Sequence, residues 1–145
     1  MKIVKAEPAE LAAFMQREWT PENIRRFGHY DAGMWIKTPG ALAAYDDTEL
    51  VGAATYYTRG GVGHLSELIV AAHKRGQGVG SALLEQFQAQ ARATGCHKLT
   101  LVTYWDPQAV DFYRKHGFAV EAVLFRDVYE TDMCQMAKFI DKEGS

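Results

Sequence analysis

The stretch Arg75-Gly76-Gln77-Gly78-Val79-Gly80 decides the fold of this chain. Three glycines in five residues leave the backbone clear of side chains, so that its N–H groups can close on an anion. The preceding run, Leu65-Ser66-Glu67-Leu68-Ile69-Val70, is rich in apolar and branched residues and predicts a buried strand. The following residues predict an amphipathic helix, because Val79, Leu83 and Phe87 recur every four residues. A strand, a glycine-rich turn and a helix N-terminus in this order predict a phosphate-binding site.

Two common phosphate-binding motifs fit this stretch poorly. A P-loop, G-x-x-x-x-G-K-[ST], needs a glycine where Ser81 stands and a lysine after it. A dinucleotide fingerprint, G-x-G-x-x-G, fits Gly76 and Gly78, but its third glycine falls on Ser81, or on Leu83 if counting starts at Gly78. The acidic residue that binds the ribose, expected about twenty residues further on, is also missing. A nucleotide-binding regulator remains an alternative that these departures disfavour.

A second informative segment runs from Trp105 to Phe118 and follows a strand-like run. Asp106 followed by Pro107 predicts a helix start, since the carboxylate caps free N–H groups and proline suits the first helical position. Gly117 predicts the helix end about three turns later.

Both segments resemble motifs of the GNAT superfamily of N-acetyltransferases. The first matches R/Q-x-x-G-x-G/A at every fixed position, and Ala109 to Phe118 is similar to the signature A-x-x-[FL]-Y-x-K-x-G-F. The family usually has asparagine where Asp106 stands. Because a further anion does not favour a polyanionic cofactor, we expect Asp106 to act mainly as a helix N-cap.

Composition is consistent with one domain, and we expect residues 1–145 to form a single one. Hydrophobic residues make up 48% and charged residues 23%, as in soluble globular proteins, and a net charge of −2 argues against nucleic acid as a partner. No apolar run is long enough to span a membrane, and Met1–Pro8 lacks the apolar core of a signal peptide. Cys96 and Cys134 are far apart in sequence, so we expect a cytoplasmic protein without a metal site or a disulfide.

The other elements complete an α/β fold of the α+β type with a mixed sheet, in the order β-α-α-β-β-β-α-β-α-β-β. This order is that of the resembled family, whose sheet splays apart between its fourth and fifth strands to admit the pantetheine arm of the cofactor. The remaining predicted elements are a strand over Lys2–Ala6, helices over Pro8–Trp19 and from Thr20-Pro21-Glu22 to Phe27, a hairpin of Ala41–Tyr45 with Leu50–Thr58, and strands over Thr100–Thr103, Val120–Phe125 and Cys134–Ile140.

The resemblance implies acetyl-CoA as the acetyl donor and no metal. It implies that the glycine-rich turn binds the pyrophosphate, and that the backbone of the preceding strand pairs with pantetheine and polarises the thioester carbonyl. The cofactor-binding residues that follow are Leu68, Ile69, Val70, Arg75, Gly76, Gln77, Gly78, Val79, Gly80, Ser81, Asp106, Phe112 and Tyr113.

Two side chains are candidates for the chemistry. Tyr113 occupies the family's tyrosine position, and a phenol can donate a proton to the departing thiolate; the alternative is a core aromatic. Glu67, a carboxylate in an otherwise apolar strand, is the candidate base for the amine, and it could instead be structural. His64 and His73 flank the same strand and are weaker candidates for the base.

The acceptor is least determined. In the resembled family its cleft is walled by the first two helices and the last hairpin, whose aromatic and acidic residues here suit a cationic amine. We therefore expect direct attack by a primary amine (a small amine, a lysine or an N-terminal amine) in a ternary complex. A non-catalytic acyl-CoA-binding module is a further alternative, and a homodimer is possible. The residues are Trp19, Phe27, His29, Tyr30 and Trp35 on one wall and Phe125, Arg126, Asp127, Tyr129, Glu130 and Asp132 on the other.

Overall fold

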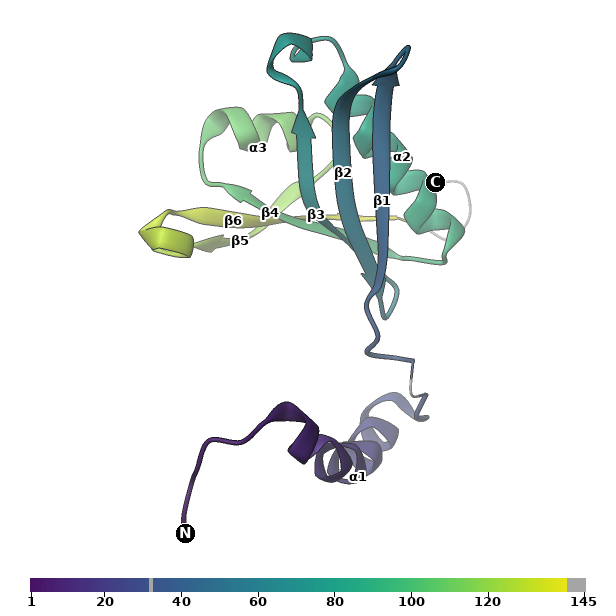
Figure 1. The fold of residues 1–145 in the computed structure, drawn as a ribbon, viewed down its shortest axis with the longest axis vertical. Helices are drawn as coiled ribbons and strands as arrows, with labels where there is room; N and C mark the ends of the chain where they lie inside the picture. The colour runs from purple at the N-terminus through teal and green to yellow at the C-terminus, as the bar shows by residue number, and fades with distance from the viewer. Residues whose placement is uncertain (32, 141–145) are drawn as a thin grey trace. The chain divides into compact units, whose positions relative to one another are not determined.

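The structure is a computed structural model that describes residues 1–31 and 33–140. The chain divides into two compact units, residues 1–36 and residues 37–145, and each is described by itself (Figure 1). The prediction of one domain over residues 1–145 stays a prediction.

In the first unit a continuous helix, α1 (Pro8–Phe27), spans the stretch where the sequence predicts two. Pro21 lies inside the helix, so the expected restart at Thr20-Pro21-Glu22 is wrong. Proline has no N–H for the helical bond to the residue four positions earlier. The helix nevertheless continues through the proline, and the hydroxyl of Thr20, which directly precedes it, donates to the carbonyl of Gln16 at 2.6 Å. Gly28 ends it in the left-handed conformation, as predicted.

The predicted strand over Lys2–Ala6 does not form. A strand is stable only when a neighbouring strand satisfies its backbone groups, and none of the described strands pairs with these residues. Ile3 and Val4, the apolar residues behind the prediction, are exposed.

The second unit is a six-stranded mixed sheet in the order β1-β2-β3-β4-β6-β5, covered by two helices (Figure 1). Among the described strands, only β3 and β4 pair in parallel, because a helical crossover joins them, whereas the other neighbours pair antiparallel. The mixed α/β class and the hairpins are as predicted. The elements are β1 (Thr38–Asp46), β2 (Glu49–Arg59), β3 (Val62–Val70), η1 (Ala72–Lys74), α2 (Val79–Ala93), β4 (Lys98–Tyr104), α3 (Pro107–Arg114), β5 (Ala119–Leu124), η2 (Val128–Glu130) and β6 (Met133–Phe139).

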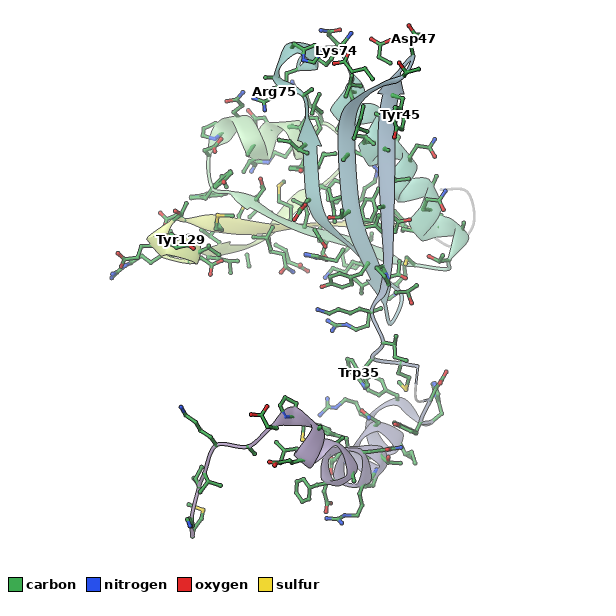
Figure 2. The ribbon with its side chains drawn as sticks, in the orientation of Figure 1. Trp35, Tyr45, Asp47, Lys74, Arg75 and Tyr129 are labelled. Carbon is green, nitrogen blue, oxygen red and sulfur yellow. The ribbon has the colours of Figure 1, made fainter. Side chains whose placement is uncertain are left out.

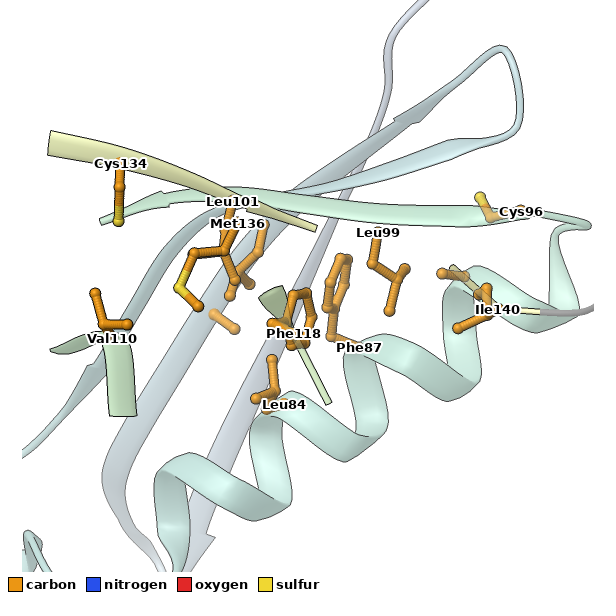
Figure 3. Packing of buried hydrophobic residues seen from close by; sticks show 13 residues of the cluster. Leu84, Phe87, Cys96, Leu99, Leu101, Val110, Phe118, Cys134, Met136 and Ile140 are labelled. Atoms are coloured by element: carbon orange, nitrogen blue, oxygen red, sulfur yellow. The ribbon is translucent and has the colours of Figure 1, made fainter. Parts of the chain in front are cut away.

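The core lies between the sheet and the helices α2 and α3 (Figure 3). Phe87 of α2 is fully buried and packs against Tyr56 of β2, with ring centroids 5.2 Å apart. Val110 of α3 and Phe118, which follows that helix, belong to the same cluster. Both helices therefore cover one face of the sheet, and alternate strand residues point to the other face.

β3 and β4 pair over only part of their length, from Val62 opposite Lys98 to Leu65 opposite Leu101. Beyond these positions the two strands diverge, which is the splay that the family resemblance implies (Figure 1). At the same point the register of β2 with β3 shifts, because Tyr56 lies opposite Leu65 whereas Thr55 lies opposite Glu67. Ser66 is therefore an extra residue in a β-bulge, which bends β3 where it leaves β4.

Candidate active site

A cavity of about 640 Å³ lies where β3 and β4 diverge, and it brings the two sequence motifs together. It is bounded by the end of β3, the glycine-rich turn with the start of α2, and α3. All the predicted cofactor-binding residues line it except Gln77, whose side-chain amide instead donates to the carbonyl of His73 at 3.2 Å. Those lining it are Leu68, Ile69, Val70, Arg75, Gly76, Gly78, Val79, Gly80, Ser81, Asp106, Phe112 and Tyr113.

The glycines of the turn are needed for their backbone conformation. Gly76 and Gly78 have φ of +74° and +87°, and a Cβ at either position would find open space. Gly78 is the N-cap of α2, and its carbonyl accepts the first helical bond, from the N–H of Ala82 at 3.0 Å. The N–H groups at the start of α2 have no partner within the helix, so this end of the cavity offers donors and the positive end of the helix dipole.

The loop that leads into this turn is fastened to its surroundings. The Arg75 Nε donates to the carbonyl of Val70 at 3.1 Å, and the Lys74 Nζ lies 2.5 Å from the Asp46 carboxylate. Figure 2 shows Lys74 and Arg75 in the loop that follows β3. On the same loop His73 contacts Glu49 at 2.7 Å. The β1–β2 turn therefore helps to hold the cavity wall in place.

Asp106 caps α3 as the sequence predicts. One of its carboxylate oxygens accepts a hydrogen bond from the backbone N–H of Ala109 at 2.9 Å, and Pro107 is the first residue of the helix. Asp106 and Ala109 also line the cavity.

Tyr113 projects from α3 into a partly apolar part of the cavity wall. Its ring packs edge-on against Phe112 at 4.9 Å and Phe118 at 6.0 Å between centroids. Burial raises the pKa of the Tyr113 phenol above its ordinary value, because the phenolate loses solvation. The hydroxyl therefore remains protonated at neutral pH and can donate.

Glu67 lies outside the cavity lining, and its side chain is exposed. The bulge explains this placement. Leu65 and Leu68 both pack with the core although three positions separate them, so Ser66 interrupts the alternation and Glu67 and Ile69 face away from α2. The buried carboxylate that the sequence suggested is thus an accessible one beside the splay.

The cavity also contains residues that the sequence interpretation did not select. Lys115 and His116 stand inside the second motif, which was the available signal, and the His116 Nε2 lies 3.0 Å from the Ser81 hydroxyl. Thr103 and Tyr104 at the end of β4 have no local signal, since only the divergence of the strands opens them to the cavity. The further residues of this kind are Lys74, Gln108 and Ala109.

The two predicted walls of the acceptor cleft lie in different units. In the first unit a separate cavity of about 660 Å³ is lined by aromatic residues, and the rings of Phe27 and Trp35 are 5.8 Å apart. Trp19 and Tyr30 also line this cavity, whereas His29 does not.

In the second unit, acidic side chains of the β5–β6 connection bind groups of the same connection. Glu130 pairs with Arg126, and the Asp132 carboxylate accepts from the backbone N–H of Arg126 at 2.9 Å. The Tyr129 side chain is 97% exposed at the tip, where Figure 2 labels it. The acids of this hairpin are therefore less available to a cation than the sequence suggested.

Within residues 1–31 and 33–140, no group of three or more His, Cys, Asp or Glu side chains is arranged to hold a metal ion. In the same part of the chain, no helix has the length and apolarity to cross a bilayer. Cys96 and Cys134 are both buried free thiols.

The diverging strands, the glycine-rich turn and the capped helix define an acetyltransferase type of fold. The chain belongs to the Acetyltransferase (GNAT) family, which it matches over residues 9–118.

Relatives and solved structures agree with this assignment. The glucosamine 6-phosphate N-acetyltransferase of Trypanosoma brucei brucei is 38% identical over 64 residues, which are 43% of this chain and 42% of that protein. The chain thus spans less than half the length of this curated relative. An acetyltransferase from Bacillus cereus has the same fold, with a TM-score of 0.74, 20% identity, and coverage of 97% of this chain and 99% of that one. An aminoglycoside 6'-N-acetyltransferase complexed with coenzyme A also shares the fold, with a TM-score of 0.64, 20% identity, and coverage of 100% and 98%.

Proposed function

We propose that this chain transfers an acetyl group from acetyl-CoA to a primary amine by direct attack in a ternary complex. The observation that carries the proposal is the cavity at the splay. This cavity joins the N-terminus of α2, which can bind an anion, to the edge of β3 where β3 diverges from β4. An extended ligand with a phosphate group needs both features. A fold shared with a coenzyme A complex supports the donor.

In this proposal the backbone holds the cofactor. The N–H groups of Val79, Gly80 and Ser81 bind the pyrophosphate at the start of α2, where the helix dipole favours negative charge. The backbone of Leu68 to Val70 pairs with the pantetheine arm as an added strand, and one N–H there polarises the thioester carbonyl. Such a donor is commonly worth about 3 kcal/mol.

Acetyl-CoA supplies an activated thioester. Two residues of the chain carry out the proton transfers, one to the departing thiolate and one from the amine. Tyr113, kept protonated by burial, donates to the departing thiolate. Glu67, accessible beside the splay, receives the amine proton through water.

The test of the donor is calorimetric titration of the protein with acetyl-CoA, and with ATP and NAD as controls. We expect the protein to bind acetyl-CoA but neither ATP nor NAD. We also expect it to release CoA from acetyl-CoA when an amine is added. ATP or NAD binding in place of acetyl-CoA would support the nucleotide-binding alternative. Binding of acetyl-CoA without transfer to any amine would support a non-catalytic acyl-CoA-binding module.

The role of Glu67 is tested separately by the pH dependence of kcat/KM in Glu67→Gln. We expect a lower rate and a loss or shift of the acid limb, because glutamine cannot accept the proton. A near-normal rate with an unshifted acid limb would remove Glu67 from the mechanism and leave a base elsewhere.

Relatives suggest the first acceptor to assay. A protein related to this chain is named for glucosamine 6-phosphate, a small amine that carries a phosphate.

A cytoplasmic location remains a prediction, supported by the two free thiols.

A further inference from the structure

A group of basic side chains surrounds Tyr57 on the sheet face that α2 and α3 leave uncovered. We call Lys37, Arg59 and His64, together with the Tyr57 ring, the basic cluster. The Lys37 Nζ lies 4.6 Å from the centroid of the Tyr57 ring and the Arg59 guanidinium carbon lies 5.8 Å from it. The His64 ring packs on the same tyrosine at 5.1 Å between centroids.

Strand alternation places the basic cluster on this face. Tyr56 packs against Phe87 in the core, so its neighbour Tyr57 points the other way. His64 lies directly opposite Tyr57 on β3, between two residues that face the core. Its Nδ1 lies 2.7 Å from the hydroxyl of Thr100 on β4, which fixes the ring.

The charge of the basic cluster is not compensated by a neighbouring acid. Among residues 1–31 and 33–140, no carboxylate forms an ion pair with Lys37 or Arg59. Burial, with Lys37 and Arg59 nearby, lowers the pKa of His64, so this ring is largely neutral at pH 7. The lasting positive charge therefore resides on the lysine and the arginine.

The basic cluster and Glu67 occupy the same face of the same strands. Tyr57 pairs with His64, and Thr55 pairs with Glu67. Because Tyr57 and Thr55 are two residues apart on β2, the two rows are about 7 Å apart. A small molecule can span that separation.

We propose that the basic cluster binds the anionic group of the acceptor, so that the substrate is a small amine that also carries a phosphate or a carboxylate. This inference rests on the proposed function. The anionic group lies against Lys37 and Arg59, and the amine lies one row further along β3, beside Glu67 and the splay. The binding energy comes from ion pairs between the anionic group and the two cations, which the aromatic ring of Tyr57 partly shields from water.

Binding is tested without turnover, by recording the NMR resonances of the His64 ring during titration of the full chain. Glucosamine 6-phosphate and glycine each carry an anionic group and are called the anionic probes, and glucosamine and glycinamide are their matched forms without that group. We expect saturable shifts with at least one anionic probe, and affinity about tenfold weaker for its matched form. Lys37→Gln and Arg59→Gln each abolish this preference. Equal responses to an anionic probe and its matched form, or none, would overturn the proposal.

Two further variants separate charge from structure. Lys98→Gln removes a cation of the same sheet face that already pairs with Glu121, and it should keep the preference. Arg59→Lys should restore most of what Arg59→Gln loses, because the charge returns. Loss of the preference in Lys98→Gln to the same extent would overturn the assignment to this cluster.

Kinetics distinguish the two levels of inference. If acetyl-CoA is bound and both members of a probe pair are acetylated with equal kcat/KM, the proposed function stands and the anion site fails. If His64 responds selectively to the anionic probes while no acetyl-CoA binds, the anion site stands and the proposed function fails.

Discussion

Tyr113 is the side chain whose environment most directly suits a chemical role. It lines the cavity from α3, and two aromatic neighbours exclude water from one side of its ring. Burial packs the ring as it would in a core tyrosine, and it also raises the pKa of the phenol, which keeps the hydroxyl protonated. Packing and proton donation are therefore compatible at this position.

We expect Tyr113→Phe to lower kcat by about 10²-fold with little change in acetyl-CoA affinity, because only the proton donor is removed. Tyr113 acts in its protonated form and burial raises its pKa above the ordinary value of about 10, so it should cause no fall in the wild-type kcat as pH increases to about 9. The measurements are calorimetry for affinity and a pH–kcat profile for both proteins. Unchanged turnover in the variant would make Tyr113 a packing residue.

Asp106 presents a separable case, because its cap and its charge can be changed independently. Asp106→Ala should lower the free energy of unfolding by about 1 kcal/mol through loss of the bond to Ala109. Asp106→Asn should keep that stability and bind acetyl-CoA about threefold more tightly, since an anion leaves the cavity wall. Urea denaturation and calorimetry measure the two effects. Weaker cofactor binding by the asparagine variant would show that the carboxylate has a positive role.

At the scale of elements, the glycine-rich turn is a short local structure with a testable backbone requirement. Gly78 at the start of α2 and Gly95 after its end both have φ above +80° and open space around a Cβ. Alanine at either position should cost about 1–2 kcal/mol of stability for the same conformational reason.

Only Gly78→Ala should weaken acetyl-CoA binding as well, because Gly78 lines the cavity whereas Gly95 does not. Denaturation and calorimetry on the two variants form the matched comparison. Equal affinity in both would place the cofactor phosphates away from this turn.

The elements differ in how well local sequence patterns predict them. The turn and the cap at Asp106 depend on residues within one helical turn, so their patterns predict them well. The strand over Lys2–Ala6 failed because its stability needs a partner that no local pattern reveals. Thr103 joins the cavity only because β3 and β4 diverge, and Lys37 meets Tyr57 only through the register of the β1–β2 hairpin. Strand register, which local propensity does not determine, hides these parts of the site.

At the scale of the whole molecule, ligand binding and folding are linked. A ligand that binds only the folded state stabilises it by about 2.7 kcal/mol when its concentration is a hundred times Kd. Acetyl-CoA at that excess should therefore raise the midpoint of thermal unfolding, and ATP or NAD at the same concentration should not. Thermal scans followed by circular dichroism check this expectation. A rise with ATP or NAD that equals the rise with acetyl-CoA would contradict selective recognition of the donor.

The bulge at Ser66 has a consequence for how this protein can change over evolutionary time. Ser66 is the unpaired residue of the bulge, so its loss would make the pairing of β2 with β3 continuous and would leave Glu67 and Leu68 on the faces they now occupy. Such a loss would remove the bend of β3, whereas a residue gained or lost elsewhere in the strand would turn every side chain beyond it to the opposite face. Residue 66 should therefore tolerate drift in identity, and it is the position of β3 where a change in chain length disturbs the two faces of the sheet least.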